Sequence, residues 1–378
     1  MAQRTRRTLI VTNDFPPRQG GIQSFVHAMA TRQPADELLV YASDYPGAAE
    51  FDAKQPFRVI RHGTGMLLPT PAASRAITAA ARDFAATAVW FGAAAPLGLL
   101  APALRRAGVE QLVATTHGHE VGWAKLPGAR QMLRRIGSEC DVVTYLGEYT
   151  RTRLAAALGP DVRLERLAPG VNTTTFAPDP DGRRRLRATL GLGDRPTIVC
   201  VSRLVPRKGQ DELIAALAGV QAQVPDVALL IVGDGKYQQS LRDQAHRAGV
   251  ADDVIFTGPV PHDQLPAHFA AGDVFAMPCR TRRRGLDVEG LGIVYLEASA
   301  MGLPVIAGDS GGAPDAVLAG RTGYVVNGWD RPAIVQRCAE LLGDETLRQM
   351  MGEAGRRWVV DEWQWDGAAA TLRAMLDR

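Results

Sequence analysis

The sequence predicts an α/β protein built from two doubly wound parallel-sheet domains. Twelve short apolar runs alternate with longer segments rich in Ala, Leu and Arg along the 378 residues. Near-continuous apolar strands separated by helices are typical of parallel sheets that helices cover on both faces. The length is also that of two domains, each with a sizeable core.

The predicted strands form two sets of six, separated by a linker. The first set covers residues 8–13, 38–43, 57–62, 88–91, 111–117 and 142–147. The second covers residues 197–202, 227–233, 254–258, 274–278, 303–308 and 323–326. Residues 167–185 are rich in Pro, Thr, Asp and Gly, which indicates a boundary. We therefore expect a first domain over 1–170 and a second over 171–359, with a C-terminal helix of about 360–378 packing back on the first.

The composition argues against several classes of protein. With 46% hydrophobic residues, 22% charged residues and a net charge of +3, the chain lacks the charge expected of a nucleic-acid binder. Its four cysteines are far apart and form no C-x-x-C pair, which favours free thiols in a reducing cytosol. The apolar run at the N-terminus is too short for a signal peptide. Residues 84–104 carry no charge, but their composition favours a strand, a turn and a short buried helix over a membrane span.

Candidate ligand-binding residues follow the predicted strands, because sheets of this kind bind ligands at the carboxyl ends of their strands. With two such domains, the cleft between them is the expected site. Gly20 and Gly21 lie between the first strand and a helix, where backbone amides could approach a phosphate or a sugar. The alternative is a plain strand-to-helix turn.

Two cations follow the first strand of the second domain. Arg203 and Lys208 lie five residues apart, ahead of a helix expected to start near Gln210. Arg could hold a diphosphate by its fork and Lys as a point charge. On their own these residues are better interpreted as solvated loop cations, the usual environment of basic residues.

Two acids flank the apolar segment "EGLGIVYLE". Glu289 and Glu297 lie eight residues apart, a little over two helical turns, so one helix could carry both carboxylates on nearly one face. Gly290 and Gly292 indicate a tight loop at the start of that helix, where an anion can bind. Together, these cations and carboxylates form a coherent nucleotide-sugar site.

Two patterns that could suggest a metal do not support one. His117 and His119, with Glu120, lack the rest of a zinc-binding set. One strand-end histidine that contacts a reacting sugar is the better interpretation. Asp179 and Asp181 form a D-x-D pattern, but they lie in the proline-rich linker, so we expect solvated turn residues.

Two further patterns stay open or are incomplete. Gly233 and Gly235 follow a strand, but the third glycine of the dinucleotide fingerprint is missing, which argues against an oxidoreductase. A cluster of arginines lies beside the Glu289 loop and reads either as a solvated loop or as a site for an anionic acceptor. Its members are Arg280, Arg282, Arg283 and Arg284.

In order along the chain, these motifs resemble those of the retaining GT-B glycosyltransferases of family 4. They are the glycine pair, the strand-end histidine, R-x-x-x-x-K and E-x7-E, and the resemblance covers nearly the whole chain. The motifs look closest to the actinobacterial branch of GDP-mannose-dependent enzymes that mannosylate phosphatidylinositol mannosides, with the best match to the α-1,6 transfer onto the monomannoside. The resemblance implies two Rossmann-like domains facing each other across a cleft, the first binding the acceptor and the second the donor.

The resemblance also implies residue roles. Arg203 and Lys208 would hold the diphosphate of GDP-mannose, and Glu297 would bind the ribose hydroxyls. Glu289 would meet the hydroxyls of the donor sugar, and His117 would contact that sugar near the reacting carbon. The remaining contacts would come from backbone groups of Gly20, Gly21, Val260, Gly290, Leu291, Gly292 and Ile293.

The family works without an essential metal, so no cofactor is expected. Retention would follow from same-face attack, with a diphosphate oxygen accepting the acceptor's proton; a covalent step through Glu289 is the alternative. Other readings are a family 4 enzyme with another donor or a non-lipid acceptor, and a nucleotide-sugar 2-epimerase of the same architecture.

A lipid acceptor implies a peripheral protein at the inner face of the cytoplasmic membrane. Met66, Leu67 and Leu68 could enter the interface, with Arg75 and Arg82 pairing with anionic headgroups. The alternative is that the apolar residues pack on the first domain.

Overall fold

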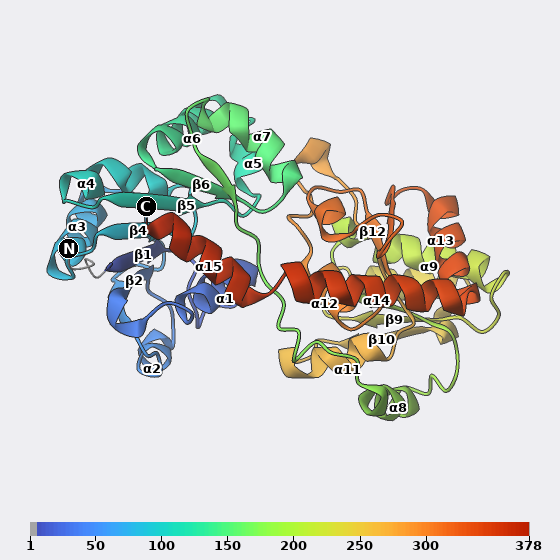
Figure 1. Ribbon diagram of the computed structural model, residues 1–378. Coiled ribbons are helices and arrows are strands. Elements are labelled where there is room, and N and C mark those ends of the chain that lie inside the picture. Colours follow the sequence, from blue (N-terminus) through green and yellow to red (C-terminus); the bar gives the residue numbers. More distant parts are fainter. Residues whose placement is uncertain (1–5, 378) are drawn as a thin grey trace. The chain divides into compact units, whose positions relative to one another are not determined.

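The computed structural model describes residues 6–377, which form two compact units (Figure 1). Unit 1 holds the residues up to Gly170 together with those from Trp365 on, and unit 2 holds Val171–Gln364. Each unit is an α/β fold around one parallel sheet.

Unit 1 contains a seven-stranded parallel sheet in the order β3-β2-β1-β4-β5-β6-β7. Its strands are β1 (Thr8–Thr12), β2 (Leu38–Ser43), β3 (Arg58–His62), β4 (Ala88–Phe91), β5 (Gln111–Thr115), β6 (Val142–Tyr145) and β7 (Leu164–Arg166). The first six were predicted from the sequence. β7 was missed because it is a three-residue edge strand, Leu-Glu-Arg, without the apolar run that marks the others.

The helices of unit 1 cover both faces of this sheet. They are α1 (Gly21–Ala30), α2 (Ala48–Asp52), α3 (Pro71–Asp83), α4 (Ala101–Arg106), α5 (Glu120–Trp123), α6 (Pro127–Glu139), α7 (Glu148–Leu158) and α15 (Trp365–Leu376), with 3-10 turns η1 (Ala35–Glu37) and η2 (Leu97–Leu100). Leu9 and Val11 of β1 join the core on one face, and Ile10 joins the core on the other. This is why the strands read as continuous apolar runs.

The C-terminal helix α15 packs in unit 1 beside α1 and against β4 and β5 (Figure 1). Leu372 and Met375 enter the core there, and the side chain of Gln111 donates a hydrogen bond of 2.6 Å to the carbonyl of Met375. The sequence analysis predicted one C-terminal helix over about 360–378. The structure instead ends a first helix at Glu362 and starts α15 at Trp365.

The uncharged segment 84–104 folds as predicted. It forms β4, η2 and α4, all within unit 1. Among residues 6–377, no helix combines the length and the apolar character that a membrane crossing needs.

Unit 2 contains a six-stranded parallel sheet in the order β10-β9-β8-β11-β12-β13. Its strands, all predicted, are β8 (Thr197–Val201), β9 (Ala228–Val232), β10 (Val254–Gly258), β11 (Val274–Met277), β12 (Val305–Gly308) and β13 (Gly323–Val326). The strand order reverses between β8 and β11, and ligands of such sheets bind at that point, beyond the carboxyl ends of the strands. The loops after β8 and β11 are therefore the first place to look for a site.

Helices flank this sheet too. They are α8 (Pro180–Thr189), α9 (Gln210–Gln221), α10 (Gln238–Arg247), α11 (Leu265–Ala270), α12 (Ile293–Ala300), α13 (Arg331–Gly343) and α14 (Glu345–Glu362), with 3-10 turns η3 (Pro206–Lys208), η4 (Ala251–Asp253), η5 (His262–Gln264), η6 (Arg283–Gly285) and η7 (Ala313–Ala316). α14 packs along α12 (Figure 1).

Candidate active site

The loop after β8 carries the predicted cations and turns sharply into α9. Gly209 has a left-handed backbone with φ of 80°, and a Cβ there would lie 2.2 Å from the carbonyl oxygen of Pro278. Only glycine fits this close approach. Lys208 is consequently held against the neighbouring loop with 8% of its surface exposed, whereas Arg203 stays exposed.

Glu289 lies at the centre of this cation cluster. Its Oε2 is 2.7 Å from Lys208 Nζ and 3.8 Å from Arg207 Nε, and the residue is 6% exposed. Burial raises the pKa of the Glu289 carboxyl, but the attraction of Lys208 and two nearby arginines outweighs burial and holds that pKa below its usual value. Glu289 is therefore ionised at neutral pH.

Arg207 is a site residue that the sequence analysis missed. Its guanidinium lies between two carboxylates, with Nη1 3.7 Å from Asp287 Oδ1 and Nε 3.8 Å from Glu289 Oε2. The available signal was its place directly before Lys208 in the same strand-end loop.

A second glycine pair, also missed, fixes the backbone of Glu289. The amide of Gly312 donates a hydrogen bond of 2.9 Å to the carbonyl of Glu289. Gly311 has φ of 60°, and a Cβ there would lie 1.9 Å from the same carbonyl oxygen. Both glycines follow the predicted strand 303–308, which was the signal that could have found them.

The two acids do not share a helix, so that prediction was wrong. α12 begins only at Ile293, because Gly292 caps it in a left-handed conformation with φ of 79°. Glu289 lies in the preceding loop, and only Glu297 is helical.

Glu297 is a buried carboxyl with no partner. It is 6% exposed, and its side chain has no hydrogen bond or ion pair to any residue of the part that the structure describes. Burial raises the pKa of Glu297 to about 7. A buried acid without a protein partner is able to accept hydrogen bonds from a ligand.

The start of α12 has the features of an anion-binding end. Gly292 provides no side-chain cap, and no acidic residue lies in the first turn. The backbone from Gly290 to Ile293, including the buried Leu291, therefore lies beside Glu289 with helix-terminal N–H groups that no side chain satisfies.

Val260, the predicted contact to the base, lies apart from this cluster in sequence. It is half-buried in the loop between β10, an edge strand of the sheet, and η5.

In unit 1, His117 follows β5, and one hydrogen bond and burial together fix its neutral form. The ring Nε2 lies 2.6 Å from the carbonyl of Gly92, so Nε2 donates its proton there. Burial lowers the pKa of His117 to about 4, which leaves Nδ1 with its lone pair at neutral pH. His117 can therefore accept a hydrogen bond but not carry a charge.

Glu120 positions the backbone of this histidine. One carboxylate oxygen, Oε2, accepts hydrogen bonds of 3.0 Å from the amides of both His117 and Gly118. The sequence analysis considered Glu120 only as a metal ligand. Residues 6–377 contain no group of three or more His, Cys, Asp or Glu side chains placed to hold a metal.

The first glycine pair begins α1. A Cβ on Gly20 would lie 2.2 Å from Oε1 of Gln23, whereas a Cβ on Gly21 would meet nothing within 4 Å. A Cβ on Gly20 would thus press only on the end of a flexible side chain, and Gly21 leaves open space at the start of the helix.

Three predictions outside the central cluster need correction. Asp179 is not a solvated turn residue, because its Oδ1 accepts a hydrogen bond of 2.8 Å from the amide of Gly182 and caps α8. Arg280 is not solvated either: it is buried, pairs with Asp211 and lies 4.1 Å above the ring of Trp329. Arg282 is half-buried, while Arg283 and Arg284 are exposed.

The third correction concerns the apolar residues 66–68 of unit 1. Leu67 is fully buried and belongs to the core. Met66 and Leu68 are 62% and 47% exposed. Of the three apolar residues predicted to enter the membrane interface, Met66 and Leu68 are therefore exposed, and Leu67 is not.

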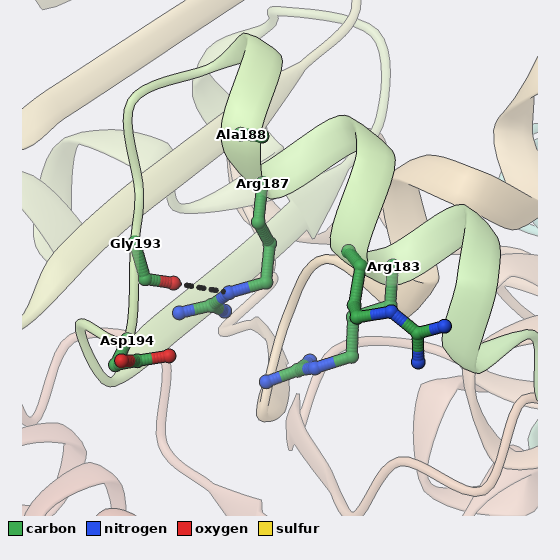
Figure 2. Close-up of a pocket in the computed structure, with 6 residues that line it drawn as sticks. Arg183, Arg187, Ala188, Gly193 and Asp194 are labelled. Carbon is green, nitrogen blue, oxygen red and sulfur yellow. Dashed lines mark hydrogen bonds between the residues drawn. The ribbon is translucent and has the colours of Figure 1, made fainter.

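A basic pocket lies in unit 2 at α8 and the loop that follows this helix (Figure 2). It has a volume of about 330 Å³ and is lined by Arg183, Arg184, Arg187, Ala188, Gly193 and Asp194. The guanidinium of Arg187 donates to the carbonyl of Gly193, as Figure 2 shows, and Arg183 donates to the carbonyls of Ala270 and Gly272. These two arginines are committed to the fold, so they are poor candidates to hold a ligand.

Two family models match successive parts of the chain. The model described as "Glycosyltransferase Family 4" matches residues 19–175, and the model described as "Glycosyl transferases group 1" matches residues 182–358.

Relatives match almost the whole chain. A protein of Mycolicibacterium smegmatis named GDP-mannose-dependent alpha-(1-6)-phosphatidylinositol monomannoside mannosyltransferase is 55% identical over 97% of this chain and 97% of its own. The protein of the same name from Mycobacterium tuberculosis (strain H37Rv) is 53% identical over 98% of both chains. In Corynebacterium glutamicum, a GDP-mannose-dependent monoacylated alpha-(1-6)-phosphatidylinositol monomannoside mannosyltransferase is 48% identical over 96% of this chain and 95% of its own.

Solved structures share the fold. Anabaena HepE in complex with UDP matches with a TM-score of 0.85 at 19% identity, covering 98% of this chain and 99% of its own. Sucrose-phosphate synthase from Thermosynechococcus elongatus matches with a TM-score of 0.78 at 21% identity, covering 98% of both chains. Together with two Rossmann-like sheets, these likenesses confirm the predicted GT-B class. The chain therefore belongs to glycosyltransferase family 4.

Proposed function

We propose that this enzyme transfers mannose from GDP-mannose to phosphatidylinositol monomannoside and forms the dimannoside with retention at the anomeric carbon. The identity of 55% over 97% of both chains to a relative of that name carries the proposal. The cluster of cations and carboxylates in unit 2 is consistent with a nucleotide-sugar donor.

The donor's two ends would bind to the two acids. Glu297 has two carboxylate oxygens without a protein partner among residues 6–377, and the vicinal hydroxyls of a ribose are suitable donors to them. Glu289 would meet the sugar hydroxyls, and the backbone at Val260 would contact the base. These assignments follow the family motifs. They are consistent with the fold, in which Val260 follows β10, Glu289 follows β11 and Glu297 lies in α12.

Stabilisation of the leaving group would come from the cations. Cleavage of the glycosyl–phosphate bond develops negative charge on the diphosphate. Arg203, Lys208 and the start of α12 follow β8 and β11 in unit 2 and would stabilise this charge. No metal would be needed for this role, because the fixed cations would provide the positive charge. A diphosphate oxygen would accept the acceptor's proton in a same-face attack.

The residues of unit 1 would act on the sugar and the diphosphate. Neutral His117 would accept a hydrogen bond through Nδ1 from a sugar hydroxyl near the reacting carbon. The amides at Gly20 and Gly21 would approach the diphosphate, since Gly21 has open space around it.

The acceptor's acyl chains imply a peripheral protein at the cytoplasmic face of the membrane. The exposed Met66 and Leu68 would enter the interface, and the exposed Arg75 and Arg82 of α3 would pair with anionic headgroups.

The test of this function is transfer of radiolabelled mannose from GDP-mannose to vesicles containing phosphatidylinositol monomannoside, followed by lipid chromatography. We expect a labelled dimannoside, no donor consumption without the acceptor, and the same rate in EDTA. Donor consumption without acceptor would favour an epimerase or a hydrolase, and label from UDP-glucose but not GDP-mannose would refute the donor.

A further inference from the structure

The cation cluster of unit 2 already contains an anion, the carboxylate of Glu289. Its Oε2 lies 2.7 Å from Lys208 Nζ and 3.8 Å from Arg207 Nε. A carboxylate oxygen thus occupies the place in the cluster where a phosphate oxygen of the donor would be expected to bind.

The hydrogen bonds of this arrangement are incomplete. Arg207 Nε and Glu289 Oε2 are both buried, and neither has an aligned hydrogen-bond partner among residues 6–377. Burying a polar group without an aligned partner is unfavourable, because the group has given up its hydrogen bonds to water. The ion pair therefore neutralises charge but leaves directional bonding capacity unused, which a ligand with several acceptor oxygens can satisfy.

We propose that Glu289 is the resident counter-ion of a diphosphate site made by Arg203, Arg207 and Lys208, and that the donor's diphosphate displaces it from Lys208. The inference rests on the proposed function and deepens it in two ways. It adds Arg207 as a third diphosphate-binding cation. It also makes Glu289 a residue that changes partner, from Lys208 in the free enzyme to a sugar hydroxyl when the donor is bound.

The local charges make this exchange selective for the intact donor. Three cations face two carboxylates, Glu289 and Asp287, in the free cluster. A diphosphate brings further negative charge next to Glu289, and like charges at this range repel strongly in a partly buried site. With GDP-mannose, the sugar hydroxyls give the displaced carboxylate new hydrogen bonds. With GDP, the displaced carboxylate has no such partner, so Glu289 competes for Lys208 and promotes release of the product.

The experiment is a titration of the full chain by calorimetry with two probes, GDP and inorganic pyrophosphate. Glu289→Gln keeps the shape of the side chain and removes its charge. We expect it to bind both probes at least about tenfold more tightly than the wild type, while its mannosyl transfer falls. Asp309→Asn is the matched control, because Asp309 is exposed at the end of β12 and forms no ion pair in the described part of the chain.

Glu297→Gln tests binding of the ribose separately from binding of the diphosphate. Because Glu297 is assigned to the ribose, this variant should weaken GDP and leave pyrophosphate affinity unchanged. If Glu289→Gln is too unstable to titrate, Glu289→Asp withdraws the carboxylate by one methylene and should tighten both probes by a smaller factor.

The outcomes distinguish this inference from the proposed function. Glu289→Gln that is folded by its thermal unfolding curve but binds GDP and pyrophosphate no more tightly than the wild type would overturn the counter-ion role alone. Equal tightening by Asp309→Asn would overturn it as well, since net charge would then explain the effect. A wild type that binds neither GDP nor GDP-mannose would refute the proposed function together with the inference.

Discussion

Burial of Glu297 makes the stability of the protein depend on pH, and one substitution removes that dependence. Burial raises the pKa of this carboxyl from its ordinary 4.5 to about 7. At about 1.4 kcal/mol per pKa unit, the interval between these values corresponds to about 3 kcal/mol. The cost arises because the ionised form loses its hydration and gains no partner.

The sign follows from proton binding. Between pH 4.5 and 7 the folded chain holds a proton on Glu297 that the unfolded chain has released, so stability falls as pH rises through this window. Glu297→Gln cannot ionise and avoids the loss. We expect its free energy of unfolding to exceed that of the wild type by under about 1 kcal/mol at pH 5 and by about 3 kcal/mol at pH 8.

The assay is thermal unfolding of the wild type and Glu297→Gln at pH 5 and pH 8. A gain of this size raises the unfolding temperature at pH 8 by several degrees. Glu353→Gln is the matched control, since Glu353 is exposed and should show no such change. The reasoning fails if the advantage of Glu297→Gln is the same at both pH values. A second readout is affinity for GDP, which should weaken in the wild type as pH falls below 7 and stay level in Glu297→Gln.

Three further predictions concern other parts of the site. Lys208→Ala should lose roughly 2–4 kcal/mol of transition-state stabilisation, measured as kcat/KM, because a fixed cation beside the leaving diphosphate is gone; an unchanged value would remove Lys208 from the mechanism. Glu120→Gln should keep most activity, since its amide oxygen can still accept the two backbone amides, whereas Glu120→Ala should lower kcat; similar kinetics in the two variants would contradict a positioning role. Met66→Asp with Leu68→Asp should weaken co-sedimentation with anionic vesicles without lowering thermal stability, and Leu67→Asp should instead destabilise unit 1 because Leu67 is buried; vesicle binding that ignores the first pair would refute this surface.

The sheets could be predicted from the sequence because strands that are buried on both faces appear in it as continuous apolar runs. All strands with an apolar run were found, and β7 was missed because Leu164–Arg166 has only one apolar residue and pairs on one side. Helix boundaries were harder where a single glycine decides them. The pattern E-x7-E permits one continuous helix, and only the left-handed conformation of Gly292 shows that Glu289 lies outside it.

The sequence motifs predicted which residues belong to the candidate site, but not which of these residues form ion pairs with one another. Sequence order separates Lys208 from Glu289 by 81 positions, so their ion pair depends on β8 and β11 being neighbours in the sheet. For the same reason the loop arginines looked alike in sequence. Arg280 is buried against Asp211 and Trp329, whereas Arg283 is exposed, and only the fold distinguishes them. The same holds for Leu67: the sequence does not show that this residue is buried while its two neighbours face solvent.

The close approaches at Gly209, Gly311 and Gly312 have a consequence for how mutants of this enzyme can be interpreted. At each of them main chain rests directly on main chain, and a Cβ would lie between 1.9 and 2.2 Å from a neighbouring carbonyl oxygen. The loops that carry Lys208 and Glu289 are thus held in place by contacts that no reactive side chain makes. Truncating a charged side chain in these loops changes the chemistry while the scaffold stays, so a kinetic defect can be attributed to the missing group. Adding a methyl group at one of the glycines should do the reverse, disabling the enzyme with every functional group still present.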